Sequence, residues 1–207
     1  MLKKVSDILF SKAVRKMQSE QGTDDFINRL IEREHWKNQL SEEQMQFIQS
    51  RDSFYLATSS TDGMPYLQHR GGRKGFITVS NASSLWFPDY AGNRQYITAG
   101  NLSENNRAFL FFMDYPNQRR LKLWGTASLL SEDAYPLSVA QQPKKGKVER
   151  ILQFDIEAID ENCRQHIQKR YTDEEYGEEL SLAKQKIILL TKQLKQLEMT
   201  IDEENRR

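Results

Sequence analysis

The chain has 207 residues, of which 38% are hydrophobic and 29% are charged, as in a globular protein with one core and helical additions. The net charge of +1 does not favour a nucleic-acid binder, and no apolar run approaches the roughly 18 residues of a membrane span. The single cysteine, Cys163, excludes an intrachain disulfide, and the polar N-terminus lacks the pattern of a secretory signal. We therefore expect a cytoplasmic protein, and the scattered histidines predict no metal site.

Residues 1–50 are predicted to be helical. Apolar residues recur at helical spacing in a first segment from Ile8 to Met17 and in a second segment from Phe26 to Ile31. The run Ser41-Glu42-Glu43-Gln44 is a capping-box pattern that opens a third helix. No residue type in this part indicates chemistry, so we expect packing helices.

The pattern changes to short strands at Ser53. Asp62-Gly63 marks a turn between the first two strands, and turns rich in Gly, Asn, Asp or Pro separate the later ones. Short strands at this spacing favour an antiparallel barrel over a parallel βαβ sheet. The strand candidates are Phe54–Thr58, Pro65–His69, Phe76–Val79, Leu85–Phe87, Ala108–Met113, Leu121–Leu130 and Arg150–Ile156.

The C-terminal segment has a heptad seam, in which apolar residues follow alternating steps of four and three. Glu, Lys and Gln fill most of the outer positions. Such a narrow stripe needs a partner helix, either from a second subunit or from the N-terminal helices of the same chain. The seam consists of Tyr176, Leu180, Ala183, Ile187, Leu190, Leu194, Leu197 and Ile201.

Positive charge is concentrated in the predicted barrel. From Tyr66 to Trp124, eight lysines and arginines stand against three acids. This excess favours a compact anionic ligand such as a phosphate, although arginines that only solubilise the strands would give the same count.

Three patches within this region could carry a ligand. In the first, Gly71-Gly72 allows close backbone approach and Arg70 could clamp a phosphate, but an ordinary polar turn has the same composition. The second holds Gly92-Asn93-Arg94, and the third, from Asn117 to Gly125, places Arg120 and Lys122 on one strand face, toward a ligand or toward water. No G-x-G-x-x-G fingerprint or P-loop is present.

Together, these patches resemble the pyridoxamine 5′-phosphate oxidase-like superfamily of FMN-binding split barrels. The resemblance is closest to a bacterial branch and runs continuously from Phe54 to Gly125. A weaker match, N-C-x-Q-H-I-x-x-R, extends it from Asn162 to about Tyr171. The shared motifs are F-Y-L-A-T, D-G-x-P-Y, H-R-G-G, G-F, D-x-x-G-N-R-Q-Y-I, G-N-L, F-x-D-Y and R-R-x-K-x-W-G.

The resemblance implies FMN in a groove between two barrels of a homodimer, to which each subunit contributes. The segment from Gln68 to Gly72 would line the flavin ring and ribityl chain, with Arg70 reaching toward the phosphate. Pro88 to Tyr90 would support the ring edge, Asn93 to Gln95 would hold the phosphate, and Arg120 would lie near the ring. The implied cofactor-binding residues are Gln68, His69, Arg70, Gly71, Gly72, Pro88, Asp89, Tyr90, Asn93, Arg94, Gln95 and Arg120.

The sequence also departs from the oxidases. Gln95 replaces a lysine of the phosphate site, the loop between Pro65 and Arg70 is longer, and the substrate-gripping Arg-x-His element has no clear copy. His166 and Arg170 are the only candidates on the substrate side, so we do not expect a true pyridoxamine phosphate oxidase.

The resemblance implies a fold of the α+β class: an antiparallel split β-barrel with N-terminal helices and a heptad-patterned C-terminal helix. We expect a helical segment at 1–50, the FMN-binding barrel at 51–160, a motif segment near the flavin at 161–172 and a coiled-coil-like helix at 173–207.

The expected function is flavin-mediated two-electron redox chemistry on an unidentified small molecule or electron donor; the alternative is a non-catalytic flavin carrier or sensor. No catalytic residue can be assigned, and His69 and His166 are only weak candidates for a proton donor. The fold also hosts haem-binding and deazaflavin-using relatives.

Overall fold

The computed structural model describes residues 5–130, 147–162 and 165–205. The chain divides into two compact units, Met1–Asp114 with Gln118–Gln165, and Tyr115–Asn117 with His166–Arg207. The helices are α1 (Val5–Leu9), α2 (Lys12–Glu20), α3 (Asp24–Glu32), α4 (Glu42–Gln49), α5 (Ile97–Glu104) and α7 (Asp173–Asn205). The strands are β1 (Ser53–Ser59), β2 (Pro65–Gly71), β3 (Thr78–Asn81), β4 (Ser84–Tyr90), β5 (Arg107–Asp114), β6 (Arg119–Leu130) and β7 (Val148–Asn162).

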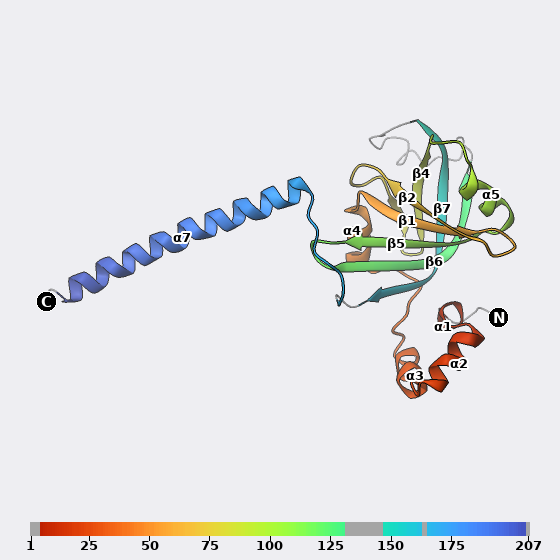
Figure 1. Cartoon of the computed structure of the whole chain (residues 1–207), viewed down its shortest axis with the longest axis horizontal. Helices are drawn as coiled ribbons and strands as arrows, with labels where there is room; N and C mark the ends of the chain where they lie inside the picture. Colours follow the sequence, from red (N-terminus) through yellow and green to blue (C-terminus); the bar gives the residue numbers. More distant parts are fainter. Residues whose placement is uncertain (1–4, 131–146, 163–164, 206–207) are drawn as a thin grey trace. The chain divides into compact units, whose positions relative to one another are not determined.

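The first unit is built around one antiparallel sheet of seven strands in the order β2-β1-β5-β6-β7-β4-β3. Figure 1 shows these strands curving around a shared interior. The curve follows from the length of β6 and β7 and from a bulge in their pairing at Trp124 and Gly125. The predicted α+β fold with an antiparallel barrel is confirmed.

The interior is filled by alternate residues of the strands. In β1, Phe54 and Leu56 are buried while their neighbours are half-exposed, and β5 repeats this pattern with Leu110 and Phe112. The ring of Phe54 contacts the ring of Phe87 at 4.9 Å and that of Phe112 at 5.1 Å between centroids. This period of two is why the strands could be recognised from the sequence.

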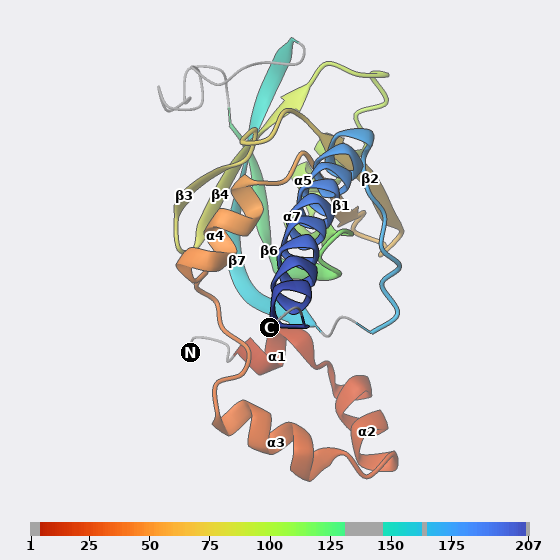
Figure 2. The ribbon, with the colours of Figure 1, turned by 90° about the vertical axis from the view of Figure 1, so that its left-hand side faces the viewer.

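Helix α4 begins at the predicted capping box and packs against β3 (Figure 2). The Gln44 backbone N–H donates to the Ser41 hydroxyl, and the Ser41 backbone N–H donates to the Gln44 side chain. Phe47 and Ile48, near the end of the helix, are buried in the core.

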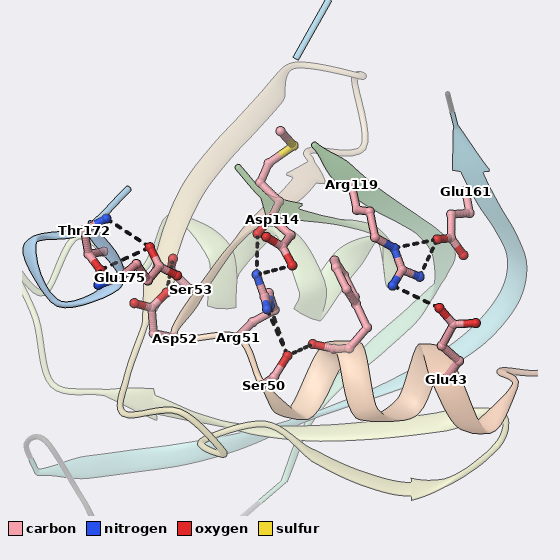
Figure 3. Close-up of polar contacts among 12 residues, drawn as sticks. Glu43, Ser50, Arg51, Asp52, Ser53, Asp114, Arg119, Glu161, Thr172 and Glu175 are labelled. Atoms are coloured by element: carbon pink, nitrogen blue, oxygen red, sulfur yellow. Dashed lines mark hydrogen bonds and ion pairs between the residues drawn. The ribbon is translucent and has the colours of Figure 1, made fainter. Parts of the chain in front are cut away.

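Two arginines hold the end of α4 against the sheet (Figure 3). The guanidinium groups of Arg51 and Arg119 lie 4.9 Å and 5.1 Å from the centroid of the Phe47 ring. Arg51 pairs with Asp114 at 3.2 Å, and Arg119 pairs with Glu161 at 2.7 Å. The hydrogen bond and the negative charge of Glu161 raise the pKa of Arg119 above its ordinary value, against the opposing effect of burial.

The N-terminal helices differ from the prediction in one respect. The segment from Ile8 to Met17 is not one helix, because α1 ends at Leu9 and Ser11 caps a new helix by accepting a hydrogen bond from the Val14 N–H at 3.3 Å. Beyond α3, the Trp36 indole N–H donates to Asp160 of β7 at 3.1 Å and ties this region to the sheet.

The second unit contains α7, which confirms the predicted C-terminal helix. A capping box fixes its start: the Thr172 backbone N–H donates to the Glu175 carboxylate at 2.9 Å, and the Glu175 N–H donates to the Thr172 hydroxyl at 3.2 Å. The helix runs for 33 residues. None of the helices in the described part of the chain combines the length and apolar character that a membrane crossing requires.

Candidate functional site

A short helix and the turn before it form one wall of a pocket in the first unit. The chain leaves β4 at Tyr90 and reaches α5 through a turn in which Arg94 and Tyr96 both adopt left-handed φ angles, 59° and 54°. The Asn93 side chain accepts a hydrogen bond from the Gln95 N–H at 3.2 Å, which stabilises this turn. Helix α5 then packs against β1, β2 and β6.

The pocket has a volume of about 220 Å³ and lies among β2, β4, α5 and the start of β7. Because β2 is at one end of the sheet and β4 is near the other, the curvature of the sheet brings its two walls together. Seven of the residues predicted to bind the cofactor line it: Gln68, Arg70, Asp89, Tyr90, Asn93, Arg94 and Gln95.

A buried cluster of charges forms part of the pocket wall. Asp89 accepts from Arg70 through one carboxylate oxygen, at 2.5 Å, and from Arg150 through the other, at 3.0 Å. Arg70 and Asp89 are each only 8% exposed. Among the described residues, the Arg70 Nε has no hydrogen-bond partner, so one buried donor stays available for a ligand.

The first turn of α5 supplies backbone donors to the same pocket. Ile97, Thr98 and Ala99 line it, and the N–H groups of a helix's first turn have no acceptor within the helix. Tyr96, at the cap position, makes no side-chain hydrogen bond to them. Thr98 instead donates its hydroxyl to Gln68 at 2.8 Å, which fixes the helix to β2.

Arg94 completes the positive character of the pocket. Within the described residues it makes no ion pair, whereas Arg70 and Arg150 share Asp89. An uncompensated guanidinium beside a free helix N-terminus is suited to bind a phosphate or another compact anion.

Other predicted cofactor residues do not line this pocket. His69 lies on the opposite face of β2, where its ring is 5.7 Å from that of Tyr55. Pro88 is buried in β4. Gly71 ends β2, and Gly72 follows with packing that excludes a side chain, because a Cβ there would lie 2.5 Å from Cγ of Phe76.

Arg120 and the substrate-side candidates also lie elsewhere. Arg120 is on β6, and its buried Nε has no hydrogen-bond partner among the described residues. His166 and Arg170 belong to the second unit, where His166 is exposed with a φ of 68° and the Arg170 guanidinium lies 5.1 Å from the centroid of the Tyr115 ring. Their roles at a flavin stay predictions, and Cys163 is outside the described residues.

Eight further residues line the pocket that were not predicted to bind the cofactor. Helix α5 was not predicted because it is short and buries only two residues, which gives no helical period in the sequence. It also contains Gly100 and Asn101, which have low helix propensity. Arg150 and Glu149 lie on β7, far along the chain, and had no local signal. The eight residues are Tyr66, Gly92, Tyr96, Ile97, Thr98, Ala99, Glu149 and Arg150.

A second cavity, of about 400 Å³, lies between α1 and strands β1, β5 and β6. Phe109 and Trp124 form much of its apolar wall, and none of the predicted site residues lines it. Its charged residues are Asp7 and Arg107, and Arg107 pairs with Glu157. It therefore has fewer converging polar groups than the pocket at α5.

Residues 40–163, more than half of the chain, match the sequence model of the family described as pyridoxamine 5′-phosphate oxidase. No curated protein matches it.

Several solved structures resemble it in part. HupZ from Group A Streptococcus is 16% identical over 64% of this chain and 100% of its own, with a TM-score of 0.48. An FMN-binding protein from Syntrophomonas wolfei is 11% identical over 70% and 97%, with a TM-score of 0.45. HutZ, a heme storage protein from Vibrio cholerae, is 16% identical over 57% and 90%, with a TM-score of 0.39. On the strength of the family match, the chain belongs to the pyridoxamine 5′-phosphate oxidase family.

Proposed function

We propose that this protein binds FMN noncovalently and holds the phosphate in the pocket at the start of α5. The observation that carries the proposal is the convergence of Arg94 and the open N-terminus of α5 on one pocket. The Nε of Arg70, which has no hydrogen-bond partner among the described residues, adds a buried donor in the same place. These groups fit a dianionic phosphate, even though Gln95 stands where the oxidases have a lysine.

The pocket holds only part of the cofactor. Its volume of about 220 Å³ is below the roughly 300 Å³ at which pockets for drug-sized ligands begin, so the flavin ring must extend beyond it. We propose that a second copy of the chain supplies the missing wall, in a homodimer with two FMN sites. Leu67 on the edge strand β2 is 62% exposed, which suits a surface that meets another copy.

When bound, FMN would supply two-electron redox chemistry. The chain's own residues then bind and orient the cofactor: Arg94 and α5 hold the phosphate, and Gln68, fixed by Thr98, lies along the pocket wall. The proposed activity is oxidation or reduction of a small molecule, and the departures from the oxidase motifs point away from pyridoxamine phosphate as the substrate.

One observation favours the alternative of a non-catalytic flavin carrier or sensor. No histidine or cysteine lines the described pocket, and His69 faces the other side of β2. A proton donor would then have to come from water or from another copy. Bleaching of bound flavin by NAD(P)H or another donor, followed by reoxidation with a small-molecule acceptor, distinguishes an enzyme from a carrier.

The direct test is the visible spectrum of the purified full-length protein, with mass identification of whatever is bound. We expect the two-band spectrum of oxidised flavin, either as purified or after incubation with FMN. A Soret band without flavin uptake would instead assign the protein to haem binding. A colourless protein that takes up no FMN would overturn the proposal.

Substitution of Arg94 tests the phosphate pocket. Arg94→Ala should weaken FMN binding by about 1.5–3 kcal/mol, the range for hydrogen bonds to a charged group, measured by flavin fluorescence titration. Arg107→Ala is the matched control, since Arg107 is half-exposed and lies outside this pocket. Equal affinity of the Arg94 variant and the parent protein would move the phosphate site elsewhere.

A further inference from the structure

We propose that α7 pairs with α7 of a second copy of this chain to form a parallel, two-stranded coiled coil. The seam side chains are exposed along the helix: Leu180 is 42%, Ile187 63% and Leu190 48% exposed. A stripe that repeats every 3.5 residues stays on one face only when two helices supercoil around each other. The seam therefore needs a helix of similar length as its partner. The proposal does not depend on FMN binding.

The N-terminal helices of the same chain are too short to be that partner. Helices α2 and α3 have nine residues each, whereas α7 has 33. At about 1.5 Å per residue, a nine-residue helix covers little more than one heptad of the seam. A second α7 matches the full length.

The central heptad of the seam has the residue types that favour two strands. In the heptad register, Ile187 occupies an a position and Leu190 the following d position, whereas the flanking a positions, Leu180 and Leu194, hold leucine. A β-branched residue at a with leucine at d is typical of parallel dimers, whereas isoleucine at d favours larger assemblies. No described d position of α7 holds isoleucine.

The charges beside the seam favour the parallel direction. Glu179 occupies a g position and Lys184 the next e position. In a parallel pair in register, Glu179 of each copy meets Lys184 of the other, so the dimer gains two attractive pairs. In the antiparallel alignment that overlaps the whole seam, Lys184 faces the uncharged Thr191, and neither pair forms. The helix is thus complementary to itself in only one direction.

Distances between labels on the full-length protein test both pairing and direction. Nitroxide labels would be placed at Glu178 or Gln185, both at outward f positions, in a Cys163→Ser background. A parallel pair gives the same short inter-copy distance at both positions. An antiparallel pair separates the Glu178 labels by roughly 30 Å along the axis but the Gln185 labels by only about 10 Å. Unequal distances of this kind overturn the direction, and long, broad distributions at both positions overturn the pairing.

Two adjacent leucines provide a matched test of the seam. Leu189 and Leu190 are both about half-exposed, but only Leu190 is on the seam. Leu190→Glu should abolish the short label distance and raise the dissociation constant of tail pairing by roughly a hundredfold, because the carboxylate would enter the helix interface. Leu189→Glu should leave the distance unchanged. Loss of the short distance in both variants, or in neither, would contradict the proposed seam.

Discussion

At the scale of single residues, the structure shows that ion pairs that look alike in the sequence differ in burial. Asp89 is buried between two arginines, and the Arg70–Asp89 pair has almost no access to water. The Arg107–Glu157 pair, in contrast, has side chains that are 50% and 31% exposed. Burial makes each partner in the first pair costly to leave alone, whereas water can replace either partner in the second.

Asp89→Asn should therefore lower the free energy of unfolding by about 3–5 kcal/mol, because the buried Arg70 would lose its countercharge and Arg150 would keep only its ion pair with Glu149. Urea denaturation of the protein without FMN measures this loss. In the control, Glu157→Gln should cost less than about 1 kcal/mol, as expected for an exposed pair. Similar losses in the two variants would show that the buried pair contributes no more to the free energy of unfolding than the exposed pair.

At the scale of elements, two glycines have different roles. Gly125 lies at the bulge where β6 changes register against β7, and a Cβ there would overlap the backbone carbonyl of Asp155. Because this neighbour is backbone, it cannot move aside without breaking the pairing of the two longest strands. Gly100 lies inside α5, and a Cβ there would have no atom within 4 Å.

Gly125→Ala should destabilise the protein by about 1–3 kcal/mol or more, through overpacking against β7. Gly100→Ala, the same change at the open position, should instead stabilise it by about 0.4–1 kcal/mol, since alanine restricts the unfolded chain and favours a helix. Thermal unfolding followed by circular dichroism checks both values. A stable Gly125 variant would mean that the bulge can relax.

At the scale of the whole molecule, FMN binding and stability are linked. A ligand that binds only the folded state, at a concentration a hundred times its dissociation constant, adds about 2.7 kcal/mol of stability. All three tryptophans, Trp36, Trp86 and Trp124, belong to the first unit, so their fluorescence reports the unfolding of that unit. We expect FMN to raise this transition temperature. Riboflavin, which lacks the phosphate, should raise it much less at the same concentration, and equal shifts would contradict a phosphate-centred site.

Much of the architecture could be predicted from the sequence because it depends on local periods. The alternation around Phe54 identified strands, the Ser41 capping box identified the start of α4, and the heptad seam identified α7. Each of these signals lies within a few neighbouring residues. Helix α5 gave no comparable signal, since Gly100 and Asn101 weaken its helical pattern and its stability comes from packing on the sheet.

The candidate site was only partly predictable for the same reason. The motifs placed Arg70 and Arg94 near a phosphate and Asp89 near the edge of the flavin ring, and all three line one pocket. They did not show that His69 lies on the other face of β2. Whether the His69 side chain faces the pocket depends on which face of β2 packs against the core.

The sequence by itself determined the order of the strands, the positions of α4 and α7, the membership of the family and the heptad spacing of the seam, because each follows from spacing along the chain. Only the tertiary structure decided which charges share a site. The antiparallel pairing of β4 with β7 sets Asp89 opposite Arg150, a residue 61 positions away. Arg70 is on β2, at the opposite end of the sheet from β3 and β4. The curvature of the sheet brings Arg70 to the same Asp89 carboxylate. Contacts of this kind depend on how distant strands pair, and no local pattern encodes that pairing.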